Sequence, residues 1–230
     1  MSGPLVDPDS VPGWLAPLVR GSVGVTRSEL GRGITPPSGA GKHAAVLVLF
    51  GADPGSGAPD VLLQLRSADL AAHAGQVCFP GGSLEDTDAG PVDAALREAG
   101  EEVGVRADDV RAVAMLPELY IPPSDFVVTP VLGLWERPGP VAPVDQAETA
   151  AVSRVPLAVL ADPVNRLTVR GPSGYAYPGF LLPGMLVWGF TGGLLDALLA
   201  MGGWERPWER AREYDLDTAW GLAERTEVIR

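Results

Sequence analysis

Continuous apolar runs separated by turn-rich segments mark the first half of the chain. The run HAAVLVLFG (43–51) is typical of a buried strand. DVLLQLRS (60–67) predicts a second strand, antiparallel to the first across the loop ADPGSGAP (52–59). AGQVCFPGG (74–82) predicts a short strand that ends at an abrupt Gly-Gly turn. These segments together predict a buried strand, an antiparallel neighbour and a further short strand.

The clearest helix follows the Gly-Gly pair. Pro91 suits the first turn of a helix, and Gly104 suits a left-handed cap after its last residue. Between them, apolar residues recur at helical spacing and form one stripe: Val92, Ala95, Leu96, Ala99 and Val103. We therefore expect an amphipathic helix with one apolar stripe.

Further elements are predicted on both sides of this helix. We expect a short helix in 11–23, strands in 111–119 and 126–135, a loop, strand and short helix in 143–162, and a strand that becomes a helix in 186–201. The pattern predicts no element for residues 205–230.

Three segments follow from this order of elements. We expect an N-terminal extension over 1–41, a core domain over 42–200 and a C-terminal extension over 201–230. A chain of 230 residues fits one domain with extensions.

Composition excludes several classes of protein. The formal net charge of −12 argues against a nucleic-acid or acidic-membrane binder, since both need positive charge. No uncharged apolar run reaches the ~20 residues that cross a bilayer, and the polar N-terminus does not resemble a signal peptide. The single cysteine, Cys78, excludes an internal disulfide and is expected to be a small core residue. We expect a cytoplasmic protein.

Three glutamates crowd onto the predicted helix. At ~100° per residue, Glu98, Glu101 and Glu102 fall within an arc of roughly 100°, away from the centre of the apolar stripe. Their mutual repulsion is offset in part by Arg97, and a hard cation such as Mg²⁺ would offset more of it. A solvated charged face is the alternative. It fits less well because Gly100 costs the helix roughly 1 kcal/mol relative to alanine.

The segment GGSLEDTDAGPVDAALREAGEEVGV resembles the Nudix box, the loop–helix signature of the Nudix hydrolases. Its R-E-x-x-E-E-x-G core is complete: Arg97, Glu98, Glu101, Glu102 and Gly104. The stretch before Arg97 is one residue longer than in the general motif. The early glutamate of the family is replaced by Asp88 or shifted onto Ala89.

The same longer spacing is typical of one branch, the coenzyme A pyrophosphatases. LLQLRSADLAAHAGQVCFPGG (62–82) is similar to the second signature of that branch, and it keeps Leu62, Leu63, Arg66, Ser67, Gly75, Phe79, Pro80, Gly81 and Gly82 in register. It departs at Gln64, where the branch has threonine, and at Ala71, where it has arginine. The resemblance covers about residues 42–200.

The resemblance implies a fold and a metal site. The fold is an α/β/α sandwich with a mixed β-sheet. Mg²⁺ or Mn²⁺ would be held by Glu98 and Glu102, with Glu101 completing the cluster or activating water, and with a backbone carbonyl near Gly82 as a further ligand. Arg97 would orient Glu101 through an ion pair.

The resemblance also implies which residues contact the substrate. Arg66 is the best cation for a substrate phosphate, within a segment that includes Phe79, Gly81 and Gly82. Some Nudix enzymes use a catalytic base outside the box, and Glu148 is the candidate for it here. The alternative interpretation, at least as well supported, is that Glu148 is an exposed loop residue without a catalytic role.

The expected activity is hydrolysis of the diphosphate of coenzyme A or its thioesters. A Nudix hydrolase of another nucleoside diphosphate derivative, such as ADP-ribose, NADH or a dinucleotide polyphosphate, is the second hypothesis, favoured by Gln64 and Ala71. A non-catalytic Nudix-fold sensor is the third, and the complete glutamate set argues against it. The expected partner is a small nucleotide substrate, and a homodimer is possible.

Overall fold

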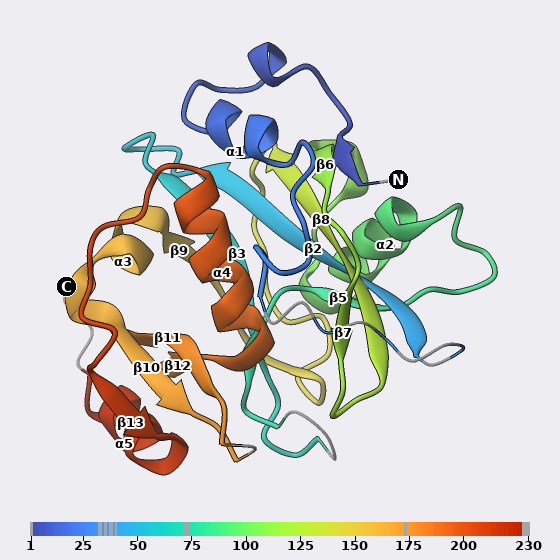
Figure 1. Ribbon diagram of the computed structural model, residues 1–230. Helices are drawn as coiled ribbons and strands as arrows, with labels where there is room; N and C mark the ends of the chain where they lie inside the picture. The colour runs from blue at the N-terminus through green and yellow to red at the C-terminus, as the bar shows by residue number, and fades with distance from the viewer. Residues whose placement is uncertain are drawn as a thin grey trace.

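The computed structural model describes residues 2–31, 34, 36, 39, 41–70, 74–172 and 174–226. Ala71 lies outside the described residues. Two sheets are present in the described part of the chain (Figure 1). The larger sheet contains β1 (Gly3–Pro4), β2 (Lys42–Ala52), β3 (Pro59–Arg66), β4 (Val77–Cys78), β5 (Gly81–Ser83), β6 (Val110–Met115), β7 (Leu119–Ile121), β8 (Phe126–Trp135) and β9 (Thr149–Pro156).

The smaller sheet and the helices complete the described elements. The smaller sheet contains β10 (Arg166–Arg170), β11 (Ala176–Leu182), β12 (Met185–Val187) and β13 (Glu213–Asp215). The α-helices are α1 (Ala16–Gly21), α2 (Pro91–Val103), α3 (Leu157–Ala161), α4 (Gly189–Met201) and α5 (Leu216–Arg225). Short 3-10 helices span Pro8–Ser10, Ala107–Asp109 and Pro163–Asn165.

Strand β2 is the centre of the larger sheet. It runs parallel to β8 and antiparallel to β3 and β5, so the sheet is mixed. Leu47 and Leu49 face a core shared with α2, whereas Val48 and Phe50 face a core shared with α1, α3 and α4. Figure 1 shows α2 and α4 on opposite sides of β2. The expected α/β/α sandwich is confirmed, and both faces of β2 are buried, which explains its unbroken apolar run.

Helix α2 begins and ends at the predicted residues. Pro91 is its first residue, and Gly104 adopts the left-handed conformation (φ 76°) that closes it. The predicted stripe faces the sheet, with Ala95, Ala99 and Val103 fully buried. Local signals alone were sufficient for this element.

The predicted turn at Gly81–Gly82 is wrong. These residues form β5, which pairs antiparallel with β2 through Ala45 and Val46. A Cβ on Gly81 would lie 2.3 Å from the carbonyl oxygen of Ala45. The glycine is required here by the close approach of two backbones and by its positive φ of 154°, and not by a change of chain direction.

The smaller sheet was not expected. Its last strand, β13, comes from the segment for which the pattern predicted no element, and it pairs in parallel with β10. Arg166 on β10 is fully buried between the rings of Phe180 and Trp208, at 4.3 and 4.4 Å from the ring centroids. Its guanidinium also forms an ion pair with Asp196 of α4. This arginine therefore ties the smaller sheet to the helix that covers the larger one.

Within the described residues, no helix is long and apolar enough to cross a membrane.

Helix α4 packs closely on β11, and Figure 1 shows the two side by side. A Cβ on Gly192 would lie 2.4 Å from the carbonyl oxygen of Pro178, whereas a Cβ on the next residue, Gly193, would meet nothing within 4 Å. The two adjacent glycines therefore differ in what they do for the fold.

We expect Gly192→Ala to lower the free energy of unfolding by about 2–3 kcal/mol, because the backbone of β11 must move to admit the methyl group. Gly193→Ala is the matched control, and it should raise the free energy of unfolding by up to ~1 kcal/mol, since alanine favours the helix. Urea unfolding followed by circular dichroism measures both. Equal effects of the two substitutions would contradict the close packing of α4 on β11.

Candidate active site

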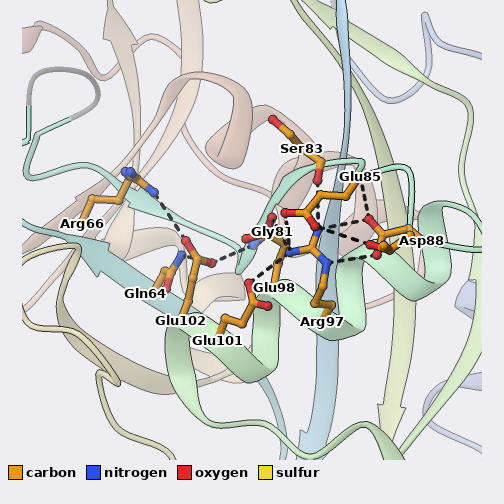
Figure 2. A network of polar contacts seen from close by, with 11 residues as sticks. Gln64, Arg66, Gly81, Ser83, Glu85, Asp88, Arg97, Glu98, Glu101 and Glu102 are labelled. Carbon is orange, nitrogen blue, oxygen red and sulfur yellow. Dashed lines mark hydrogen bonds and ion pairs between the residues drawn. The ribbon is translucent and has the colours of Figure 1, made fainter.

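The Nudix-box residues of α2 face the end of β3 and the glycine strand β5. Figure 2 shows four charged residues of α2, namely Arg97, Glu98, Glu101 and Glu102, gathered with Gln64 and Arg66 of β3 and Gly81 of β5. Residues far apart in sequence are brought together because β2 pairs with both β3 and β5, while α2 packs on β2 and β5.

The three glutamates differ in burial. The exposed fraction of the side chain is 61% for Glu101, 17% for Glu98 and 8% for Glu102. The expectation that the three carboxylates converge on one patch is therefore wrong for Glu102, which points inward toward β3 and β5. It is accommodated there because polar groups of β3 and β5 line that part of the sheet (Figure 2).

Glu102 is held by three groups. The side-chain Nε2 of Gln64 donates to its Oε2 at 2.8 Å, and the backbone N–H of Gly81 donates to the same oxygen at 2.9 Å. Its Oε1 lies 3.6 Å from Nη1 of Arg66. Burial nevertheless raises the pKa of the Glu102 carboxyl above its ordinary value, because the two hydrogen bonds offset the loss of hydration only in part.

Glu98 lies directly over Gly82. A Cβ on Gly82 would be 2.4 Å from Oε1 of Glu98, so only glycine leaves room for this carboxylate in its present position. Burial raises the pKa of Glu98, and the neighbouring Arg97 opposes that rise. Two carboxylates of α2 thus share a poorly hydrated space, next to a backbone segment that has no side chain.

Arg97 connects the acidic loop to the helix. Its Nε and Nη2 donate to the two carboxylate oxygens of Asp88 at 3.0 and 3.1 Å, and its Nη1 donates to Glu98 at 3.1 Å and to Glu101 at 3.0 Å. The hydrogen bonds from Arg97 hold the pKa of Asp88 below its ordinary value. Between the two alternatives for the displaced acidic residue of the motif, Asp88 is the one that contacts Arg97, and Ala89 is not.

Arg66 and Glu148 lie at the rim of this site. Arg66 pairs with Thr149 where β3 meets β9, and the carbonyl of Glu148 accepts from the backbone N–H of Ser67 at 2.8 Å. The side chain of Arg66 is partly exposed, and Glu148 is an exposed residue. Arg66 is therefore placed beside Glu102, and the backbone of Glu148 lies next to the end of β3. Phe79, in contrast, is packed in the core, so we assign it to packing and not to substrate contact.

Two residues of the site were not predicted to contact the glutamates. Gln64 and Thr149 are buried, and the hydroxyl of Thr149 donates to Oε1 of Gln64 at 3.2 Å. The signal was present in the sequence, because a glutamine within the apolar run of a buried strand needs a polar partner. Cys78 contacts the same amide at 3.6 Å. Burial, and secondarily the charge of Glu102, raises its pKa to about 11, which is consistent with an unreactive thiol.

The donor atoms fit a hard divalent cation. Within the described residues, no three acidic, histidine or cysteine side chains are drawn together as a ready cation site. Glu98 and Glu101 are both bound to Nη1 of Arg97, and Glu102 is turned toward β3. The chemistry of the site still favours such an ion, because carboxylate oxygens are the preferred ligands of Mg²⁺ and Mn²⁺. A cation would also offset the burial that raises the pKa of Glu98 and Glu102.

Comparison with curated proteins finds relatives of part of the chain. A protein of Pectobacterium atrosepticum named Uncharacterized Nudix hydrolase NudL is 48% identical over 93 residues, which cover 40% of this chain and 46% of that protein. The protein of the same name from Cronobacter sakazakii is 44% identical over 117 residues, which cover 51% of this chain and 58% of that protein. The chain thus spans about half the length of the curated relatives it matches.

Solved structures are similar over a comparable portion. A Nudix hydrolase from M. smegmatis, RenU, is 30% identical with a TM-score of 0.44, over 53% of this chain and 75% of that one. The NUDIX domain of Shewanella oneidensis NrtR, solved with ADP ribose, is 18% identical with a TM-score of 0.42, over 53% of this chain and 76% of that one.

The sequence profile of the NUDIX domain matches residues 41–176, more than half of the chain. The matched segment contains all of the site residues described above, from Gln64 on β3 to Thr149 on β9. Both the length of the match and the site within it show that the chain belongs to the Nudix family.

Proposed function

We propose that the protein is a Mg²⁺- or Mn²⁺-dependent hydrolase of a nucleoside diphosphate derivative, with coenzyme A or its thioesters as the preferred substrate. The observation that carries the proposal is the pair of poorly hydrated carboxylates, Glu98 and Glu102, beside the glycine strand β5. A fold that gained nothing from these charges would place neutral residues there, because burying a carboxylate costs free energy.

Glu98 and Glu102 would hold the metal, with the backbone at Gly82 next to them. The bound ion would neutralise the diphosphate oxygens, lower the pKa of a water molecule and stabilise the leaving phosphate. Glu101 is the most exposed of the three glutamates and is oriented by Arg97, so it is suited to accept a proton from the attacking water or to complete the metal site. Glu148 is the alternative base.

Coenzyme A is proposed on the strength of the second signature and of Arg66. Hydrolysis of its diphosphate would yield 4′-phosphopantetheine, or its acyl form, and adenosine 3′,5′-bisphosphate. Arg66 lies next to Glu102, and its side chain is partly exposed. Its guanidinium would offer a charge-assisted hydrogen bond to a substrate phosphate. The second candidate, another nucleoside diphosphate derivative, is favoured by Gln64, where the coenzyme A branch has threonine.

The assignment of Glu102 to the metal predicts a separation of stability from activity. We expect Glu102→Gln to lower kcat by about 10²-fold or more, equivalent to roughly 3 kcal/mol, because it removes a charge from the site. Without metal, in the presence of a chelator, the variant should be at least as stable as wild type. Its amide oxygen can still accept from Gln64 and Gly81, and no charge is buried. Near-wild-type kcat at saturating Mg²⁺ would refute the role.

Gly82 gives a second test, through Glu98 alone. The three atoms nearest the methyl group of Gly82→Ala all belong to the carboxylate end of Glu98, which can swing away, so the protein should fold normally. Activity should fall by about 10- to 100-fold, as is typical when a metal-binding side chain is displaced. Steady-state kinetics and thermal unfolding measure the two effects. Full activity in a folded Gly82→Ala protein would show that the position of Glu98 does not matter.

Substrate choice is tested with coenzyme A, dephospho-coenzyme A, ADP-ribose and NADH. We expect coenzyme A to have the highest kcat/KM. Arg66→Gln should raise its KM by about 10-fold, the loss of one charge-assisted phosphate contact. Arg20→Gln is the matched control, because Arg20 carries the same charge on α1, across the sheet from α2. A higher kcat/KM for ADP-ribose or dephospho-coenzyme A would leave only the broader hydrolase assignment.

A further inference from the structure

A buried chain of polar groups runs from β9 through β3 to α2. The hydroxyl of Thr149 donates to Oε1 of Gln64, and Nε2 of Gln64 donates to Oε2 of Glu102 at 2.8 Å. The exposed fraction is 1% for each of Gln64 and Thr149. Neither residue belongs to the Nudix box, and both lie on strands outside α2. These hydrogen bonds therefore link the larger sheet directly to one proposed metal ligand (Figure 2 shows the Gln64–Glu102 bond).

The chemistry of the three groups fixes their orientation. An ionised carboxylate only accepts hydrogen bonds, so Gln64 must turn its NH₂ toward Glu102 and its oxygen toward Thr149. That oxygen then needs a donor, and the Thr149 hydroxyl is the donor it has. Without this hydroxyl, a buried amide oxygen would lack a partner, and the amide would gain by turning its oxygen elsewhere.

The two carboxylate oxygens of Glu102 differ in the hydrogen bonds they accept. Oε2 accepts two hydrogen bonds, from Gln64 and from the backbone N–H of Gly81. Oε1 accepts none of the hydrogen bonds found among the described residues and faces Arg66 at 3.6 Å. One oxygen is therefore tied to β3 and β5 by hydrogen bonds, and the other faces only the partly exposed guanidinium of Arg66 among the described residues.

We infer that Gln64 and Thr149 are positioning residues, which hold Glu102 so that it offers Oε1 alone to the metal ion. The inference rests on the proposed function, because it requires that Glu102 bind a cation. It adds that the affinity of the site for the metal ion depends on an amide and a hydroxyl in the sheet, neither of which touches the metal. Partners of metal ligands typically change affinity or activity by about 10- to 100-fold when they are removed.

The test measures Mn²⁺ binding by calorimetry, without substrate, in the full-length protein. Gln64→Met keeps the length of the side chain and removes the donor. We expect it to weaken Mn²⁺ binding by about 10- to 100-fold and to lower kcat by a similar factor, with the KM for coenzyme A changed by less than about 3-fold. A purely structural role for Gln64 would lower the melting temperature and leave the Mn²⁺ affinity unchanged, which would overturn the inference.

Thr149 supplies a matched pair of variants. Thr149→Ser keeps the hydroxyl and should bind Mn²⁺ like wild type, whereas the isosteric Thr149→Val should weaken binding by about 3- to 10-fold. Adding Thr149→Val to Gln64→Met should weaken binding no further, because Thr149 acts only through Gln64. If Gln64→Met does not fold, the Ser and Val variants decide the question, and equal affinities for the two would overturn the inference.

Thr168→Val controls for the loss of any buried hydroxyl. Thr168 lies on β10 in the smaller sheet, and its hydroxyl donates to the carbonyl of Arg210 at 2.7 Å. This variant should be destabilised like Thr149→Val but should keep the wild-type Mn²⁺ affinity, and an equal loss of affinity in both would overturn the inference. If wild type itself neither binds Mn²⁺ nor cleaves a substrate, the proposed function fails. If wild type does both and the variants match it, only the inference fails.

Discussion

Burial of the Glu102 carboxylate is the constraint around which the site is organised. A charged group on the inner side of a helix is unstable unless the sheet beneath it supplies donors. Here β3 supplies Gln64 and β5 supplies the N–H of Gly81. Both strands must therefore reach the same stretch of α2, and they do so because each pairs with β2. The central strand thus serves the chemistry by placing donors, although it contributes no side chain to the site.

The glycine strand β5 answers a second demand of the same carboxylates. Its backbone must approach β2 closely on one side while leaving space for Glu98 on the other. A side chain at Gly81 would strike β2, and one at Gly82 would strike Glu98. The two adjacent glycines are thus required by different neighbours, one for the fold and one for the site. Because the loop that follows β5 carries Asp88, which pairs with Arg97, the position of β5 also sets the acidic loop.

Sequence reasoning succeeded where local signals and the environment agree. Strand β2 is apolar throughout because both of its faces are buried, and α2 is bounded by Pro91 and Gly104. It failed where a distant neighbour decides the conformation. Gly81–Gly82 has the composition of a turn, and only the approach of β2 makes it a strand. In the smaller sheet, β13 was missed because its partner, β10, lies more than 40 residues earlier. Strands β10 and β11 pair locally and were not predicted either.

For the site, sequence similarity identified the Nudix-box residues but not their surroundings. The periodicity of α2 placed Glu102 beside Glu101 on one patch, since helical geometry gives the direction of a side chain and not what it meets. The inward position of Glu102 depends on Gln64, 38 residues earlier in the chain. A polar residue in a buried strand indicates that it has a polar partner. Which residue is the partner follows only from the register of β3 against β9 and from the packing of α2.

Electrostatics links these local arrangements to the whole chain. With a net charge of −12, the protein as a whole repels an anionic substrate, so attraction has to be generated within the site. The described cations nearest the glutamates are Arg66 and Arg97, and they differ in how closely they are paired with carboxylates. Arg97 is engaged by Asp88, Glu98 and Glu101 at 3.0–3.1 Å, whereas the contact of Arg66 with Glu102 is longer, at 3.6 Å. If a divalent ion takes over Glu102, Arg66 is released to face the substrate. Metal binding would then add positive charge twice, once through the ion itself and once by freeing the arginine beside it.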